Sequence, residues 1–280
     1  MSTRFYGLSD EPTANRFHIN AERAIVMSDL GNYRDLIITS HPGPSNVFIL
    51  TLSRPPENRL NASFAQEIIR ALRAIESAIP PDASGAIITR GADAKFWSTG
   101  LDLEEVKRNP TANNDGFYPL LATLLDLRVP TIALLTGHTF GGACPLALAH
   151  DYRIMNADRG FWCMPPVDLG LHFDGIGALL KAKLMPRTAR AMLLEGHKWT
   201  GKEACEEGIV DAVAAQDRML EEAVMRAERV APKAKRNVYA LLRAELCGDA
   251  AEAFRRISWV HGRETRGYSP SAGREWKAKM

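Results

Sequence analysis

The stretches FWSTGLD (residues 96–102) and FGGAC (residues 140–144) decide how this chain folds, because each is a glycine-containing turn that opens a predicted helix. The helices are expected over residues 103–108 and 142–150. The start of a helix exposes unpaired backbone N–H groups and partial positive charge, so each turn can hold an anion or a polarised carbonyl oxygen. Two such turns aimed at one point would form an oxyanion hole, which serves chemistry through an enolate or a tetrahedral intermediate.

Strands and helices alternate around these turns. Apolar strand candidates over residues 85–90 and 130–137 precede the first and the second turn. Two shorter β-rich runs, residues 35–40 and 47–53, predict a hairpin. Between them and the first turn, apolar residues recur at steps of three and four, which predicts an amphipathic helix over residues 62–78. This alternation favours an α/β fold with a mostly parallel sheet covered by helices.

The chain divides into three predicted parts: an N-terminal extension (1–34), an α/β core (35–195) and a C-terminal helical region (196–280). Residues 109–116 are polar and interrupt the pattern, and we interpret them as a mobile loop over the site. Helices are predicted near the C-terminus over residues 189–194, 201–207, 217–230, 232–246 and 250–262.

Composition excludes several classes of protein. The net charge is +2 without a clustered basic face, which argues against nucleic acid as a partner. No apolar run approaches the length of a membrane span, and the first residues lack the apolar core of a secretory signal. The four cysteines show no C-x-x-C spacing and the histidines no H-E-x-x-H pattern, so reduced thiols and no bound metal are expected.

Four motifs in order connect the chain with a known family: LSRPPENRLNASF (52–64), KFWSTGLDL (95–103), ALLTGHTFGGACPLALAHDYRI (133–154) and WTGKEACEEGIVDAV (199–213). The sequence resembles the crotonase superfamily, the enoyl-CoA hydratases and isomerases. The resemblance implies a crotonase-type spiral of ββα units and a C-terminal helical region that assembles homotrimers or dimers of trimers. It implies an acyl-CoA thioester as substrate and no separate cofactor, since coenzyme A is part of the substrate.

The resemblance also implies roles for residues of both turns. The amides of Thr99 and Gly142 are expected to hold the thioester oxygen, and Gly142 must stay small so that the acyl group can approach. Pro56 and Arg59 lie in the loop that is expected to border the adenine and pantetheine, where Arg59 could pair with a phosphate. The remaining residues expected to contact substrate near the thioester are Ser98, Gly100, Leu101, Asp102 and Gly141.

The proton-transferring group is where the chain departs from the hydratase pattern. Hydratases carry two glutamates at the positions occupied here by Pro145 and Pro166, and neither proline can move a proton. Asp174 is the remaining candidate, because its place looks like that of the catalytic carboxylate in peroxisomal 3-enoyl-CoA isomerases. Its alternative role is the N-cap of a helix starting at Gly175. Asp168 is a weaker candidate base.

A single carboxylate in an apolar pocket suffices to remove a proton from one carbon and return it two carbons away. We therefore expect an enoyl-CoA isomerase that shifts a double bond from the 3- to the 2-position. Two alternatives remain open: a specialised acyl-CoA hydratase, lyase or hydrolase of secondary metabolism, and a non-catalytic acyl-CoA-binding pseudoenzyme, which the loss of both hydratase acids would produce.

The last three residues, Ala278-Lys279-Met280, fit the small–basic–apolar form of a peroxisomal import signal. A chance ending on a charged tail is the alternative reading. Because fatty acyl-CoA chemistry is common in peroxisomes, we expect recognition by the peroxisomal import receptor, with the cytoplasm as the other possible location.

Overall fold

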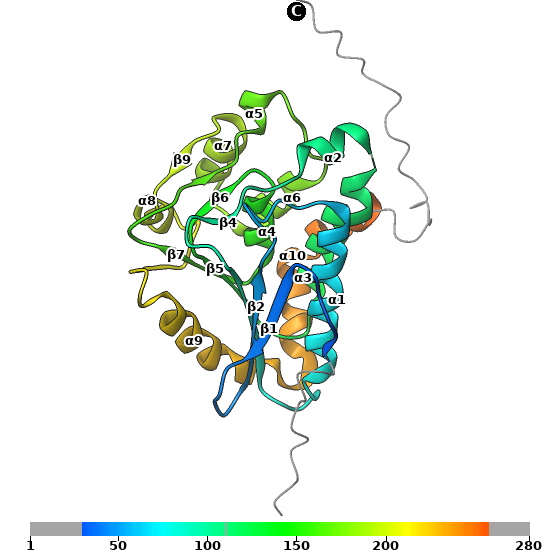
Figure 1. Ribbon diagram of the computed structural model, residues 1–280, viewed down its shortest axis with the longest axis vertical. Coiled ribbons are helices and arrows are strands. Elements are labelled where there is room, and N and C mark those ends of the chain that lie inside the picture. Colours follow the sequence, from blue (N-terminus) through cyan, green and yellow to red (C-terminus); the bar gives the residue numbers. More distant parts are fainter. Residues whose placement is uncertain (1–29, 110, 258–280) are drawn as a thin grey trace, which may run out of the picture.

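The computed structural model describes residues 30–109 and 111–257. Nearly all of the predicted N-terminal extension and the tripeptide Ala278-Lys279-Met280 lie outside these residues. The described chain forms two sheets, one of six strands and one of four, with helices packed around them (Figure 1). Within the described ranges, no helix combines the length and the apolar character that crossing a bilayer requires.

The six-stranded sheet has the order β1-β2-β3-β5-β7-β10. β1 pairs antiparallel with β2, as the predicted hairpin requires, and the other neighbours are all parallel. The predicted strands before both turns are confirmed as β3 and β5. The strands are β1 (Leu36–Ser40), β2 (Asn46–Leu52), β3 (Gly85–Gly91), β5 (Thr131–Leu135), β7 (Tyr152–Asn156) and β10 (Ala212–Ala214).

Both faces of this sheet are buried. Val47 and Ile49 of β2 pack in a cluster with Met219, Ala223 and Ala227 of α9 (Met219–Val230). Alternate residues of the same strand belong to the main core on the opposite face, since side chains of a strand point to alternate sides. Figure 1 shows α9 on one side of the sheet and α1, α3 and α10 on the other. Burial on both faces explains why these strands read as continuous apolar runs.

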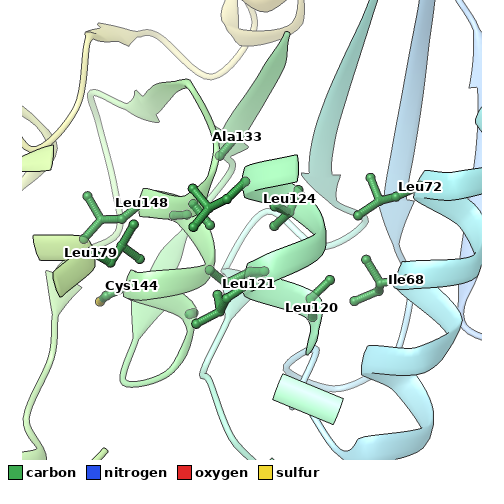
Figure 2. Packing of buried hydrophobic residues seen from close by; sticks show 14 of the residues in the cluster. Ile68, Leu72, Leu120, Leu121, Leu124, Ala133, Cys144, Leu148 and Leu179 are labelled. Carbon is green, nitrogen blue, oxygen red and sulfur yellow. The ribbon is translucent and has the colours of Figure 1, made fainter. Parts of the chain in front are cut away.

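The main core lies between the sheet and a layer of helices. In Figure 2, leucines of α3 lie between Ile68 and Leu72 of α1 on one side and residues of α4 on the other. α1 begins where Asn61 caps it, by accepting a hydrogen bond from the amide of Phe64 at 2.8 Å. The helices of this layer are α1 (Ala62–Ala78), α3 (Tyr118–Asp126), α4 (Ala143–Ala149), α6 (Ile176–Lys183) and α10 (Val238–Ile257).

The four-stranded sheet, in the order β4-β6-β8-β9, positions the two glycine turns. β4 (Phe96–Ser98) and β6 (His138–Phe140) pair in parallel, and β8 (Trp162–Cys163) extends the sheet in the same direction. β9 (Lys198–Trp199) is antiparallel at the far edge. Because parallel strands end at the same edge of a sheet, the turns that follow β4 and β6 are brought side by side.

Two predictions about helices are wrong. The predicted mobile loop contains instead the π-helix η2 (Asn113–Phe117), in which Gly116 packs so closely on α1 that a β-carbon there would lie 2.6 Å from the Cα of Ala62. Of the two helices predicted over 232–246 and 250–262, the part up to residue 257 forms the 3₁₀-helix η3 (Ala231–Asn237) and the single helix α10, and residues 258–262 lie outside the described residues. The remaining helices are α2 (Leu103–Arg108), α5 (Pro166–Leu169), α7 (Pro186–Leu194) and α8 (Gly201–Glu206).

A buried ion pair joins α10 to the core. The guanidinium of Arg243 donates to both carboxylate oxygens of Asp151, at 2.7 and 2.5 Å, and to the carbonyls of Leu127 and Val129. The two side chains are 4% and 9% exposed. Burial by itself raises the pKa of Asp151, but the charges of Arg243 and Lys183 and the hydrogen bonds from Arg243 and Thr131 together outweigh burial and hold that pKa below its ordinary value.

Replacing Arg243 with methionine is expected to lower the free energy of unfolding by about 3–5 kcal/mol, because a buried carboxylate loses its partner. Urea denaturation at neutral pH measures the loss. Adding Asp151→Asn to this variant should restore part of the stability, since the uncompensated charge is then removed. An unchanged urea midpoint for Arg243→Met would show that the ion pair does not hold α10.

His150 ends α4 and is 1% exposed. Its Nδ1 lies 2.9 Å from the Leu146 carbonyl and its Nε2 lies 3.0 Å from the Thr89 hydroxyl. Because a carbonyl can only accept, we assign the proton to Nδ1, which leaves Nε2 to accept from Thr89. Burial lowers the pKa of His150 to about 4.

This histidine is expected to make the protein less stable in acid. The unfolded chain takes up a proton near pH 6.5, whereas the folded chain resists protonation down to about pH 4. The stability from neutral His150 is therefore complete above the unfolded pKa, and about 3 kcal/mol is lost as the pH falls between these values. Urea denaturation of wild type and His150→Gln over this range measures the difference. Parallel pH profiles for the two proteins would contradict the assignment.

Candidate active site

The two glycine turns meet at the common edge of β4 and β6. A β-carbon on Gly100 would lie 2.5 Å from the amide nitrogen of Gly142 and 2.6 Å from the carbonyl oxygen of Phe140. A β-carbon on Gly142 would lie 2.9 Å from Cγ and 3.3 Å from the amide nitrogen of Leu101. Both positions therefore need glycine. At Gly100 the backbone gives a second reason, because its φ of +84° lies in the left-handed region that favours glycine.

Most amides of the two turns already have acceptors. Those of Gly100 and Asp102 donate to Ser98 Oγ at 3.1 Å and to the Leu60 carbonyl at 2.8 Å. The amide of Gly141 donates to the Cys163 carbonyl at 2.9 Å. Within the part of the chain that the structure describes, the turn amides that find no acceptor are those of Leu101, Gly142 and Ala143.

Thr99 is not one of these free donors. Its amide donates to the carbonyl of Glu57 at 3.0 Å, and its hydroxyl lies 3.2 Å from the Glu57 carboxylate. Leu101 takes its place as the candidate, because bonds from Leu60 to Gly100 and from Asp102 to Leu60 fix the backbone on both sides of it. Successive N–H groups of an extended segment point to opposite sides, so the Leu101 amide points away from Leu60. The sequence carries no signal for this choice, since Thr99 and Leu101 flank the same glycine.

Two of the residues expected to contact substrate have structural roles in the first turn. Ser98 is fully buried, and its hydroxyl donates to the carbonyl of Asn58 at 2.7 Å. Asp102 caps α2 by accepting from the amide of Glu105 at 3.3 Å. The carboxylate of Asp102 also lies 3.8 Å from Arg54. These contacts hold the turn in shape around the Leu101 amide.

The positions of the two hydratase glutamates are apolar here. Pro145 is buried within α4 and Pro166 is buried at the start of α5. α5 is a short helix, so Asp168 stands on an exposed helical turn and not on a strand. Its carboxylate lies toward Gly196, where a β-carbon would be 2.6 Å from Oδ2.

Asp174 lies just before α6, which packs against α4, the helix that follows the second turn. The N-cap of α6 is Gly175 in a left-handed conformation. The Asp174 side chain is 46% exposed, and its Oδ1 lies 3.6 Å from Nδ1 of His172. The described residues therefore do not enclose it in the dry pocket that we expected, because the segment between α5 and α6 lies at the surface.

A polar pocket of about 620 Å³ lies beside the first turn. Three residues expected to bind substrate line it together: Pro56, Arg59 and Asp102. Arg54 lies between the carboxylates of Asp35 and Asp102, 3.8 Å from each, and so offsets both charges. The other lining residues are Arg34, Pro55, Asn61, Ser63, Glu67 and Arg70.

This pocket leaves basic groups available to an anion. Both oxygens of Glu67 accept backbone amides, those of Arg34 and Asp35. Among the described residues, Arg70 has no carboxylate within ion-pair distance. The part of the chain described in the structure contains no group of three or more histidine, cysteine or acidic side chains that could hold a metal ion.

Comparison with known proteins agrees with this architecture. Residues 43–256 match the family described as Enoyl-CoA hydratase/isomerase. Enoyl-CoA delta isomerase 2, peroxisomal, of Arabidopsis thaliana is 37% identical over 221 residues, which cover 72% of this chain and 91% of the relative. Carnitinyl-CoA dehydratase of Citrobacter koseri is 32% identical over 210 residues, or 74% of this chain and 78% of that protein.

Solved structures show the same fold. The human mitochondrial delta3-delta2-enoyl-CoA isomerase superposes with a TM-score of 0.70 at 23% identity, over 78% of this chain and 85% of that one. Parallel strands covered by helices, with paired turns at one strand edge, define a protein of the crotonase fold. The chain belongs to the enoyl-CoA hydratase/isomerase family.

Proposed function

We propose that the protein is an enoyl-CoA isomerase that moves a double bond of an acyl-CoA from the 3- to the 2-position. The observation that carries this proposal is the pair of free amides at Leu101 and Gly142, which lie together where no hydratase acid remains. The names of the Arabidopsis relatives support it as well.

In this reaction the Asp174 carboxylate removes a proton from C2 of the 3-enoyl thioester. The electrons of that C–H bond move toward the thioester carbonyl, and the resulting dienolate oxygen accepts hydrogen bonds from Leu101 and Gly142. Each such donor typically contributes about 3 kcal/mol to the transition state. The protonated Asp174 then returns its proton to C4, which leaves the double bond between C2 and C3.

The phosphates of coenzyme A are assigned to the pocket beside the first turn. Its cations stand next to Asp102, one residue beyond the proposed Leu101 donor, so a thioester at the turn would place the rest of the carrier within the pocket. Arg70 supplies the unpaired charge, since Arg54 is balanced by two carboxylates. Arg59 pairs with Glu57 through Nε at 2.8 Å and would use its terminal N–H groups to bind a phosphate. A bound acyl chain would also shield Asp174 from water.

Assays on 3-enoyl, 2-enoyl and dienoyl thioesters of coenzyme A test the function. The expected result is conversion of the 3-enoyl to the 2-enoyl thioester. Part of the proton removed from C2 should be found at C4, and the rest should have exchanged with solvent. Water addition to crotonyl-CoA would favour the specialised hydratase or lyase instead. Tight binding of acyl-CoA without turnover of any thioester would favour the pseudoenzyme.

Assembly and location form part of the proposal. One side of α10 packs on α3 and α6, while Val238, Leu241, Leu242 and Leu246 are 51–76% exposed, which supports self-association into trimers through this apolar face. Light scattering coupled to size exclusion measures the oligomer. Two Arabidopsis relatives are named peroxisomal, which supports import into peroxisomes. Imaging of a fluorescent fusion tests that location.

A further inference from the structure

The loop that lines the phosphate pocket is joined directly to the first turn of the active site. The carbonyl of Glu57 accepts from Thr99 and the carbonyl of Asn58 from Ser98. Leu60 then donates to the Gly100 carbonyl at 2.7 Å. These bonds follow one another along residues 57–60 and 98–102, so the two segments are held in a fixed register.

Asn58 is the centre of this connection. It is 4% exposed and has a φ of 50°, a left-handed conformation that asparagine tolerates better than most residues. Its side chain accepts from the amide of Arg54 at 2.8 Å and donates to the carbonyl of Trp97 at 2.9 Å. Its own amide donates to the Arg54 carbonyl at 2.8 Å. Every polar group of Asn58 therefore links the pocket loop to β4 or closes the loop itself.

Glu57 provides a second connection. Its Oε2 accepts from Nε of Arg59 at 2.8 Å and lies 3.2 Å from the Thr99 hydroxyl. Arg59 lines the pocket, and Thr99 stands two residues before the Leu101 amide. One carboxylate oxygen thus contacts both the pocket-lining Arg59 and Thr99 of the turn.

We infer that Asn58 and Glu57 are positioning residues through which occupation of the pocket by the nucleotide end of coenzyme A aligns the Leu101 amide. The inference rests on the proposed function of the site and adds a role for coenzyme A in aligning the active site. Binding energy from a remote part of a substrate raises kcat when it is used to orient the reacting groups. The nucleotide is then required for rate as well as for affinity.

Hydrogen exchange tests this coupling without any turnover. Adenosine 3′,5′-bisphosphate is the probe, because it can fill the pocket but carries no thioester to contact the turn. We expect its binding to slow exchange of the Thr99, Gly100 and Asp102 amides about fivefold or more in the wild type, about 1 kcal/mol in opening free energy, and to have no such effect in Asn58→Gly. Binding that leaves these three amides unchanged, or no binding at all, would overturn the inference.

Steady-state kinetics provide the second test. In the wild type, replacing coenzyme A by pantetheine in the substrate should lower kcat about tenfold, in addition to raising KM. Asn58→Gly keeps the left-handed backbone free of strain but removes the side-chain bonds, so its kcat should be low with both carriers and their ratio close to one. A wild-type ratio retained in this variant, or a loss confined to KM, would contradict the coupling.

A matched control separates positioning from general loss of structure. The side chain of Asn46 also donates to a backbone carbonyl, that of Ser84 at 2.9 Å, but at the opposite end of β2. Asn46→Ala should keep the wild-type ratio of kcat values, and thermal melting confirms that both variants are folded. Wild-type protein that turns over no enoyl thioester would refute the proposed function, while the exchange response would still decide the coupling.

Discussion

Replacing Gly100 with alanine is expected to lower kcat/KM at least about a hundredfold, which corresponds to the loss of one oxyanion donor. The new β-carbon would lie 2.5 Å from the Gly142 nitrogen and 2.6 Å from the Phe140 carbonyl, and both are backbone atoms that cannot move aside cheaply. It would therefore push the two turns apart and separate the Leu101 and Gly142 amides. Steady-state assay with the 3-enoyl thioester measures the loss.

Gly208→Ala is the matched control for this variant. Gly208 also has a positive φ, +69°, but a β-carbon there would meet no atom within 4 Å. Both substitutions carry the same backbone strain, on the order of 1–2 kcal/mol, whereas only Gly100→Ala disturbs the amide pair. Equal activity losses in the two variants would remove the amide pair from the mechanism.

Asp174→Asn is expected to lower kcat about a thousandfold or more, because the amide cannot carry the proton from C2 to C4. Binding of the acyl-CoA should be largely retained, since the pocket and the free amides of Leu101 and Gly142 are left intact. Measurement of kcat together with a direct titration of acyl-CoA binding separates these two quantities.

Asp168→Asn distinguishes between the two acids of this segment. Asp168 stands on the exposed turn of α5 and faces Gly196, so its loss should leave kcat near the wild-type value. The opposite pattern, with activity lost in Asp168→Asn and kept in Asp174→Asn, would show that Asp168 and not Asp174 transfers the proton.

The predictable parts of this fold are those coded by local patterns. The amphipathic period of α1 and the continuous apolar runs of β3 and β5 could be read directly, and their boundaries agree closely with the observed helix and strands. The helix after each glycine turn was equally readable, because a cap or a glycine marks its start. The second sheet, in which β4 pairs with β6, was not predicted.

The unpredictable parts depend on partners distant in the sequence. The polar residues before α3 suggested a loop, but packing of Gly116 on α1 overrides local preference and gives a π-helix. Likewise, residues 247–249 separated two predicted helices, yet burial of Ala250, Ala251 and Phe254 keeps α10 continuous through them. Such tertiary contacts contribute more free energy than the propensity of a single residue.

The sequence by itself determined the family, the two glycine turns and the absence of both hydratase acids, because these are matters of residue type and spacing. Only the tertiary structure decided which amides remain free. A backbone N–H has the same chemistry in every residue, so its availability depends on the acceptor that folding brings to it. The carbonyl of Glu57 occupies the amide of Thr99, and the bonds of Leu60 turn that of Leu101 away from this loop.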